Sequence, residues 1–384
     1  MNILFVINNL YSDGNGLCAS ARRTIGLLRE RGPEVRVLSA CGPDGQTPDY
    51  PLPDWHMPLF GPLVARQGYR FAARDKAVIR QALEWADLVH LEEPFFLQMT
   101  VCRMARSMGV PCVATYHLHP ENFFASVGLQ RSRYFNAATL WVWRKYVYDH
   151  CAIVQCPTER VRERLARRGF RAELRVISNG LLPEERPGAG PHIHTPGEPY
   201  NILCVGRYSE EKDQMTLLRA MEYTKHAHEI RLILAGRGPK EEKLRAAAEK
   251  LCRDGVLTIP PVFGFYSAAG LEELFAQADL YIHCATVEVE GLSCMEAVRT
   301  GIVPLIADGP LTATAQFALS RESRFPVGDA KALAAGIDYW LSDDEARRRE
   351  AARYTALGEQ YAIARSIDAL VQMYRDALTA PGVR

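Results

Sequence analysis

The sequence lacks the features of a secreted, membrane-spanning or thiolate-metal protein. Its first residues, MNILFVINNL, contain no basic segment, and their apolar run is too short for a signal peptide. No apolar stretch approaches the roughly 20 residues that a spanning helix needs. The 10 cysteines are scattered and form no C-x-x-C pair, so neither a zinc knuckle nor a dithiol redox site is predicted. We therefore expect reduced thiols in a cytoplasmic protein, with any membrane contact peripheral and at the inner face.

The chain also lacks an excess of charge of either sign. Lys and Arg number 46 and Asp and Glu 45, a formal net charge of +1, so a nucleic-acid partner is not expected. There is no repeat at solenoid periods and no low-complexity tail. A chain of 384 residues, 48% of them apolar, is a soluble globular protein that is too long for one ordinary core. Two domains are the natural expectation.

Short apolar runs alternate with helical segments in both halves of the chain. The predicted strands cover residues 2–8, 34–40, 230–236, 256–260, 280–285 and 303–307, and residues 200–209 are predicted as a strand followed by a glycine-bearing turn. The predicted helices cover residues 17–32, 213–224, 240–252, 270–278, 293–301 and 343–378. This alternation predicts βαβ units and parallel sheets with helices on both faces. The fold class is therefore α/β, with two Rossmann-like doubly wound domains facing across a cleft.

A segment crowded with Pro and Gly separates the two halves and predicts a linker. We expect a first domain over residues 1–185, a linker over 186–199 and a second domain over 200–360. The helix at about 360–380 is expected to pack back on the first domain. Doubly wound domains bind ligands at the carboxyl ends of their strands, so the loops that follow the strands are the places to seek a site.

The first such loop carries GNGLCA (14–19), which fits G-x-G-x-x-A between a strand and a helix. A dinucleotide site also needs an acid at the end of the second strand, but Glu34 precedes that strand. An NAD-dependent oxidoreductase is therefore kept only as an alternative. Gly14, Asn15 and Gly16 serve equally well as a loop that lets backbone approach a sugar or a phosphate.

A second loop, GRYSEEKD (206–213), places Arg207 and Lys212 on one strand-to-helix turn. Two cations beside the amides of a helix N-terminus suit a diphosphate. The alternative is a capped helix with solvated charges.

A third loop, EVEGLSCME (288–296), holds three carboxylates and a glycine. Gly291 and Leu292 lead into a helix whose first amides favour negative ligand charge. Glu296 could accept hydrogen bonds from ribose hydroxyls and Glu288 from sugar hydroxyls, whereas Glu290 has no assigned role. The alternative is a solvated loop entering the first turn of a helix.

A fourth segment, TYHLHP (115–120), ends a strand with two histidines. Two histidines at i and i+2 are half of a metal site, but no third ligand is evident, and no metal is expected. A histidine that projects into the cleft and bonds a substrate is favoured over a core histidine.

Together these segments resemble the retaining GT-B glycosyltransferases of the family-4 type, also described as glycosyl transferases group 1. The similarity is carried by GRYSEEKDQMTLLRA, LILAGRGP, LEELFAQADLYIHCATVEVEGLSCMEAVRTGIVPLIA and FPVGD, across most of residues 200–330. In the first half only the fold pattern, the glycine loop and TYH are similar. Two departures are Glu290, where the family often has an aromatic residue, and DGPLTATAQ, where it usually has a Gly-Gly turn and an acid.

The resemblance implies a metal-independent, retaining hexosyltransferase-type enzyme without a cofactor. The donor would be a nucleotide diphosphate sugar, UDP-sugar first and GDP-sugar second. The acceptor would be a glycan, a lipid-linked molecule or a small molecule, and the product a cell-surface polysaccharide or glycoconjugate. The first domain would bind the acceptor and the second the donor. A nucleotide-sugar epimerase of the same fold is the second alternative.

The resemblance also implies roles for single residues. The family's E-x7-E motif falls on Glu288 and Glu296, and its strand-end histidine on His117. The catalytic set so implied is His117, Glu288, Arg207 and Lys212. The donor-binding set is Arg207, Lys212, Gly236, Val262, Glu288, Gly291, Leu292, Ser293 and Glu296. The acceptor or phosphate loop is Gly14, Asn15 and Gly16.

One further segment, residues 129–150, mixes tryptophan and tyrosine with arginine and lysine. Basic and aromatic residues on one helix can lie on an anionic membrane surface, which would suit a lipid-linked acceptor. The alternative is that the aromatic side chains pack against the first domain and the cations are solvated.

Overall fold

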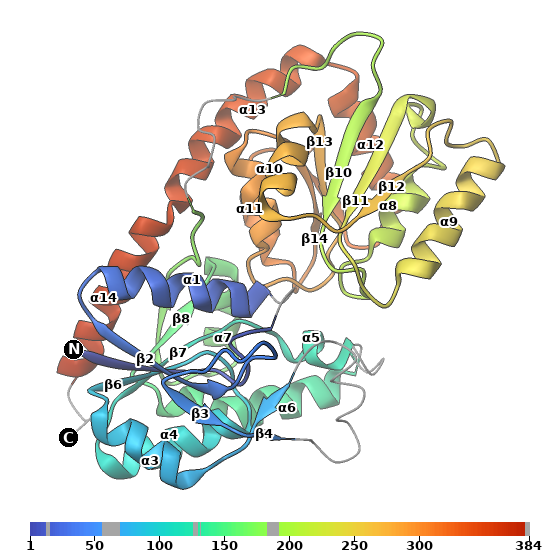
Figure 1. Cartoon of the computed structure of the whole chain (residues 1–384). Coiled ribbons are helices and arrows are strands. Elements are labelled where there is room, and N and C mark those ends of the chain that lie inside the picture. The colour runs from blue at the N-terminus through green and yellow to red at the C-terminus, as the bar shows by residue number, and fades with distance from the viewer. Residues whose placement is uncertain (13–15, 56–69, 126–129, 131, 183–191, 381–384) are drawn as a thin grey trace. The chain divides into compact units, whose positions relative to one another are not determined.

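The chain folds into two compact units, Met1–Asn179 with Ala364–Arg384, and Gly180–Ile363 (Figure 1). The computed structural model describes residues 1–12, 16–55, 70–125, 130, 132–182 and 192–380. The second unit begins before residue 185 because Leu181 pairs with the end of that unit. The Leu181 amide donates to the Tyr361 carbonyl at 2.8 Å, and the Ile363 amide donates to the Leu181 carbonyl at 2.8 Å. The expected linker, 186–199, begins outside the described residues.

The sheet of the first unit has the order β3-β2-β1-β6-β7-β8-β9, with parallel pairing throughout. Ile3, Leu4, Phe5 and Val6 are all buried, which is typical of a parallel strand covered on both faces. The strands are β1 Asn2–Val6, β2 Glu34–Ala40, β3 Tyr50–Leu52, β6 Leu88–Leu91, β7 Cys112–Thr115, β8 Ile153–Cys156 and β9 Glu173–Val176. A separate antiparallel ladder joins β4 Asp54–Trp55 and β5 Phe71–Ala72.

Helices cover both faces of this sheet. Figure 1 shows α1 on one face and α3 and α4 on the opposite face. The helices are α1 Gly16–Glu30, α3 Lys76–Trp85, α4 Phe96–Met108, α5 Pro120–Ala125, α6 Arg133–Tyr146, η1 Tyr148–His150, α7 Glu159–Arg167 and α14 Ile363–Thr379.

The sheet of the second unit has the order β12-β11-β10-β13-β14-β15, again parallel throughout. Its strands are β10 Tyr200–Val205, β11 Ile230–Ala235, β12 Val262–Gly264, β13 Leu280–His283, β14 Val303–Asp308 and β15 Arg324–Pro326. Its helices are α8 Gln214–Ala220, η2 Ala227–Glu229, α9 Glu241–Arg253, α10 Ala268–Gln277, α11 Leu292–Arg299, η3 Ala313–Phe317, α12 Ala330–Leu341, α13 Asp344–Gly358 and η4 Glu359–Tyr361. In Figure 1, α8 and α9 lie on one side of the sheet and α10 and α11 on the other.

In each sheet the strand order reverses beside one strand. β1 lies between β2 and β6 in the first unit, and β10 lies between β11 and β13 in the second. At such a reversal the loops leaving neighbouring strands separate and open a crevice at the carboxyl ends. The predicted α/β fold of two parallel, doubly wound domains is confirmed.

Two predicted elements are wrong. Residues 256–260 form no strand, because the Val256 and Leu257 amides donate back to the Leu251 carbonyl and finish α9. The strand at this position is β12, which starts at Val262. The predicted helix over 343–378 is two helices, because the backbone at Ala362 leaves the helical path to pair with Leu181.

No helix in the described part of the chain combines the length and apolarity needed to cross a bilayer.

Candidate active site

Lys212 and Glu288 form an ion pair at the strand reversal of the second unit. Lys212 comes from the loop after β10, and Glu288 from the loop after β13, which is the next strand in the sheet. The two loops are joined by Thr286, whose amide donates to the Glu211 carbonyl at 2.8 Å. The Glu288 amide also donates to the Leu311 carbonyl at 2.8 Å. Both predicted residues are therefore brought together by fixed backbone.

The environment fixes the protonation states of this pair. Burial raises the pKa of Glu288, but the charge of Lys212 and the hydrogen-bonding contact of His283 more than offset it, so that pKa lies well below its usual range. Burial lowers the pKa of Lys212, but Glu288 outweighs that effect and the pKa is raised. Burial lowers the pKa of His283, whose Nε2 lies 3.5 Å from Glu288 Oε2. At neutral pH the site thus holds a carboxylate, an ammonium and a neutral imidazole.

Gly291 begins helix α11 next to this pair, and only glycine fits there. Its φ is 79°, in the left-handed region, and an added Cβ would lie 2.2 Å from Thr314 Cγ2. The first turn of α11 is fixed by Ser293, whose hydroxyl accepts from Tyr281 at 2.8 Å and donates to the Val205 carbonyl at 3.3 Å. The free amides of that turn are therefore held at the carboxyl end of β10.

The loops after β10 and β11 touch through glycine backbone. An added Cβ at Gly236 would lie 2.0 Å from the Gly206 carbonyl oxygen, so the contact excludes any side chain. Arg207, which follows Gly206, is half-buried, and its carbonyl accepts from Gln214 Nε2 at 2.9 Å. The structure gives Gly236 a packing reason, and its contact with a donor stays a prediction.

The remaining predicted donor residues lie in the same unit. Leu292 and Ser293 are in the first turn of α11, and Glu296 is in the next turn and half-buried. Val262 begins β12 and is exposed, whereas Gly264 is the residue of β12 in register with the end of β11 at Ala235. The donor-binding roles of these four residues stay predictions.

His117 pairs with a carboxylate that sequence reasoning did not select. Its Nε2 lies 2.5 Å from Glu92 Oε2, and the two side chains are only 8% and 3% exposed. His117 follows β7 and Glu92 follows the neighbouring strand β6. Burial raises the pKa of Glu92, but the combined effect of His117 and His90 in the opposite direction is larger, so the pKa lies below its usual value.

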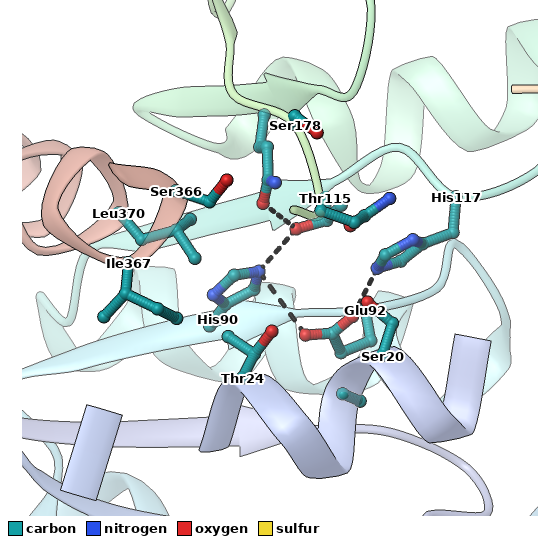
Figure 2. Close-up of a pocket in the computed structure, with 13 residues that line it drawn as sticks. Ser20, Thr24, His90, Glu92, Thr115, His117, Ser178, Ser366, Ile367 and Leu370 are labelled. Atoms are coloured by element: carbon teal, nitrogen blue, oxygen red, sulfur yellow. Dashed lines mark hydrogen bonds and ion pairs between the residues drawn. The ribbon is translucent and has the colours of Figure 1, made fainter. Parts of the chain in front are cut away.

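A polar pocket of the first unit surrounds this pair. Figure 2 shows Glu92 between His90 and His117. The pocket is lined by Ser20, Ala21, Thr24, His90, Glu92, Thr115, His117, Gln155, Ser178, Asn179, Ser366, Ile367 and Leu370. Most of these side chains carry hydroxyl, amide or ionisable groups, which match a polar ligand or ordered water.

A directed chain of hydrogen bonds passes through His90 in the same pocket. Thr115 donates its hydroxyl to Gln155 Oε1 at 2.6 Å, so toward His90 Nε2, 2.7 Å away, it accepts. His90 therefore carries its proton on Nε2, and its Nδ1 accepts from the Tyr374 hydroxyl of α14 at 2.7 Å. Burial lowers the pKa of His90 to about 4, which keeps it neutral near pH 7.

The two histidines of TYHLHP have different surroundings. His119 is buried, its Nδ1 lies 3.0 Å from the Tyr116 hydroxyl, and its amide donates to Asn122. It is a satisfied core histidine, whereas His117 lines the pocket. Gly14 and Asn15 lie outside the described residues.

Sequence reasoning missed Glu92 and His90, although both lie in VHLEEPFF, His90 within the buried strand β6 and Glu92 directly after it. The sequence did contain a signal for them. Two ionisable residues lie at the carboxyl end of one strand, and His117 follows the next strand along the chain. His283 was missed because it reads as part of an apolar strand, β13, and its proximity to Glu288 depends on the path of the loop between them, which backbone contacts of Thr286 and Glu288 hold.

Helix α6 divides its aromatic residues between the core and the surface. Trp143 is buried with Leu140, whereas Trp141 and Tyr146 are 49% and 47% exposed. Lys145 Nζ lies 4.8 Å from the ring centre of Trp141 and 5.4 Å from that of Tyr146. Trp143 thus packs against the first domain, as one alternative expected, whereas contact of the exposed residues with a membrane stays a prediction.

Two parallel doubly wound units, with charged residues on the loops at a strand reversal, define the GT-B class of fold. Residues 191–356 match the family described as glycosyl transferases group 1, and residues 14–185 match Glycosyltransferase Family 4. The chain belongs to the group 1 glycosyltransferases, as its sequence predicted.

The chain is similar along most of its length to characterised members. Alpha-monoglucosyldiacylglycerol synthase of Streptococcus pneumoniae (strain ATCC BAA-255 / R6) is 25% identical over 328 residues, 80% of this chain and 71% of that protein. GDP-mannose:cellobiosyl-diphosphopolyprenol alpha-mannosyltransferase of Xanthomonas campestris is 28% identical over 335 residues, 83% and 82% of the two chains. The structure of sucrose-phosphate synthase from Thermosynechococcus elongatus has a TM-score of 0.73 at 17% identity and covers 99% of each chain, a likeness of fold.

Proposed function

We propose that this glycosyltransferase moves a sugar from a UDP-sugar or GDP-sugar to a lipid-linked acceptor, with retention at the anomeric carbon and without a catalytic metal. The observation that carries the proposal is the Lys212–Glu288 ion pair beside the glycine-started helix α11. These groups present a cation, helix amides and a carboxylate at one strand reversal. A nucleotide diphosphate sugar offers the matching anionic and hydroxyl-bearing parts.

Lys212 and the first amides of α11 would stabilise charge that develops on the departing diphosphate. Their positions are set before substrate arrives, by the Thr286–Glu211 contact and by Ser293. Preorganised donors of this kind stabilise a transition state without a reorganisation cost. Arg207, on the same turn, would add a second cation. The diphosphate charge then needs no divalent metal.

Glu288 would accept hydrogen bonds from sugar hydroxyls. Because its pKa lies well below the usual range, it stays ionised at neutral pH and is not a proton donor. Its role would be to place the anomeric carbon rather than to transfer a proton. Glu296, one turn along α11, would bond the ribose hydroxyls.

In the first unit, His117 would contact a substrate hydroxyl, and Glu92 would orient its ring. The Glu92 carboxylate accepts from Nε2, which leaves Nδ1 for a second partner. Gly14, Asn15 and Gly16 would line the acceptor side, as the sequence predicts.

The names of the relatives support a lipid acceptor and widen the choice of donor. One is named for a glucosyldiacylglycerol and another for a diphosphopolyprenol, and the latter is named for GDP-mannose as donor. The exposed Trp141 and Tyr146 with Lys145 would hold the protein at an anionic membrane where such acceptors reside.

The first experiment is a calorimetric and thermal-shift screen against UDP, GDP, ADP, NAD and the sugar conjugates, without metal and then with magnesium. We expect one tight nucleotide, either UDP or GDP, with binding weakened in Arg207→Ala. Transfer from the matching labelled sugar nucleotide to an isoprenoid diphosphate oligosaccharide or to diacylglycerol would then be followed in EDTA. The anomeric configuration of the product, read by NMR, tests retention. Binding of NAD, or of no nucleotide, would overturn the proposal.

A further inference from the structure

Three side chains of metal-binding type meet at the amino-terminal edge of the second sheet. His192 and His194 lie on the segment before β10, and Asp279 immediately precedes β13, which pairs with β10. One ligand atom from each residue lies within 4.8 Å of those of the other two. The sequence presented His192 and His194 only as part of a Pro- and Gly-rich linker.

The side chains of this segment point alternately to opposite sides, which places both histidines on the same side. Ile193, between them, is 64% exposed, whereas His194 is buried. Residues i and i+2 of an extended chain share a face. The His194 ring is stacked on Tyr200, with ring centres 3.9 Å apart and an interplanar angle of 18°, so its orientation is fixed.

Asp279 offers one oxygen to the histidines and uses the other for the fold. Its Oδ2 accepts from the Asn201 amide at 2.8 Å, which fixes the carboxylate at the start of β10. Its Oδ1 is buried and accepts no hydrogen bond from any residue that the structure describes. An oxygen in that position favours a cation closer than the Arg347 guanidinium, which lies 3.5 Å away, because an unsatisfied buried carboxylate oxygen is costly.

The spacings suit a shared metal ion better than a shared proton. Asp279 Oδ1 lies 3.3 Å from His194 Nδ1 and 3.8 Å from His192 Nε2, longer than good charge-assisted hydrogen bonds. Zinc holds nitrogen and carboxylate oxygen at about 2.0–2.2 Å, which in a tetrahedron places neighbouring ligand atoms about 3.3 Å apart. Both distances from Asp279 Oδ1 lie within about 0.5 Å of that spacing, and all three ligand atoms lie within 4.8 Å of one another, so small side-chain movements would bring them onto one ion.

The local charge admits a cation. Arg347 Nη2 lies 3.5 Å from Asp279 Oδ1, but it is also held by Asp344 Oδ1 at 2.8 Å. Two carboxylates and one guanidinium leave a formal charge of −1 before a metal binds. Arg347 Nη1 donates to the Trp340 carbonyl at 2.9 Å, so the arginine keeps partners when the ion takes Oδ1.

We propose that His192, His194 and Asp279 bind one divalent transition-metal ion, with zinc as the expected occupant and water in the fourth position. Two imidazoles and a carboxylate are ligands that zinc accepts. The site lies at the amino ends of the strands, about 20 Å along β10 from the candidate active site. The ion would tie the segment before β10 to the start of β13 and stabilise the unit, with no part in glycosyl transfer.

The test uses the full chain after dialysis against EDTA. Calorimetry with ZnCl₂ should give one tight equivalent in the wild type, lost in His194→Ala and weakened at least about tenfold in His192→Ala. At a hundredfold excess of free zinc over Kd, wild-type Tm should rise by about 5–10 °C. The control is His228→Ala, since His228 is an exposed histidine of η2 in the same unit and should not alter zinc binding.

Cobalt(II) distinguishes this site from the free cysteines. A tetrahedral site of nitrogen and oxygen ligands gives visible d–d bands without the strong near-ultraviolet bands of cobalt thiolates. Equal zinc affinity in wild type and His194→Ala, thiolate bands, or no tight equivalent in the wild type would each overturn the proposal. If His194→Ala does not fold, His192→Ala decides, because the His192 side chain is 23% exposed and tolerates truncation.

Discussion

At the scale of single residues, buried charges in fixed protonation states dominate both units. Lys212 and Glu288 hold opposite charges at the strand reversal of the second unit. Glu92 is ionised beside His117 in the first, and His90 is neutral beside them. Each of these protonation states follows from the effect of burial on the pKa of the group, which one or two neighbouring charged groups oppose or reinforce. Single substitutions should therefore have separable effects on charge and on packing.

Lys212→Ala should lower kcat/KM by at least about 100-fold while the chain stays folded, because one preorganised cation is lost. Glu288 would remain partly buried without its partner, so stability should fall by about 1–3 kcal/mol. Nucleotide release and circular dichroism measure the two effects. Lys250→Ala, which removes an exposed lysine of α9, is the control and should change neither. Wild-type turnover in Lys212→Ala would contradict the assignment.

Glu92→Gln should reduce transfer roughly tenfold or more, because the neutral amide holds the His117 ring less firmly. Glu92→Asp, which keeps the charge, should retain more activity than Glu92→Gln. Equal transfer rates for all three proteins would show that Glu92 only fills space.

His90 should make the protein less stable in mild acid. The unfolded chain binds a proton at His90 below about pH 6.5, whereas the folded chain does so only near pH 4. Its contribution is thus complete above pH 6.5 and is lost as the pH falls toward 4, at up to about 1.4 kcal/mol per pH unit. Urea unfolding at pH 7.5 and 5.0 should show a smaller pH effect in His90→Gln than in wild type. An equal effect would show that other groups titrate instead.

At the scale of elements, the turns before α8 and α11 carry backbone that few residues tolerate. Asp213 is, among the described residues, the only one other than glycine with positive φ, at 45°, and it begins α8 directly after Lys212. Gly291 begins α11 with φ of 79°. Unusual backbone at both turns of one strand reversal is typical of a functional site.

Gly291→Ala should displace the first turn of α11 and lower both Tm and transfer, because the new methyl group meets Thr314 Cγ2. The matched control is Gly255→Ala, which has φ of 73° but open space around the added Cβ. It bears only the left-handed backbone cost, roughly 1 kcal/mol, and should keep its activity. Adding Thr314→Ser, which removes Cγ2, should partly restore Gly291→Ala. Equal losses in the two glycine variants would contradict the steric explanation.

At the scale of the whole molecule, net charge is close to zero, so any membrane attraction must come from a local surface. The exposed face of α6 is such a surface, with Trp141, Lys145 and Tyr146 in contact. Aromatic rings and a lysine stem can insert at the level of lipid headgroups.

Wild-type protein should therefore sediment with vesicles that contain phosphatidylglycerol, more weakly as salt is raised. Trp141→Ala with Tyr146→Ala should reduce the bound fraction several-fold, since both exposed rings are removed. Tyr339→Ala, an equally exposed tyrosine of the second unit, is the control. No sedimentation of the wild type, or no change in the double variant, would count against a membrane role for α6.

The sequence by itself determined the class of fold and the position of the candidate site in the second unit. Strands of buried apolar residues alternate with helices, and that periodicity is local, so β10, β11 and β13 could be predicted within a few residues. Lys212 and Glu288 could be predicted because each follows a strand that the sequence marks. The structure of residues 256–260 could not be predicted from the sequence, since an apolar run can follow the end of a helix as well as form a strand.

Only the tertiary structure decided which distant residues meet. Glu92 touches His117 because β6 and β7 are neighbours in the sheet, and His90 meets Tyr374 because α14 returns to the first unit. His194 meets Asp279 because β10 pairs with β13. Periodicity specifies strands and faces but not strand order, and strand order sets these contacts.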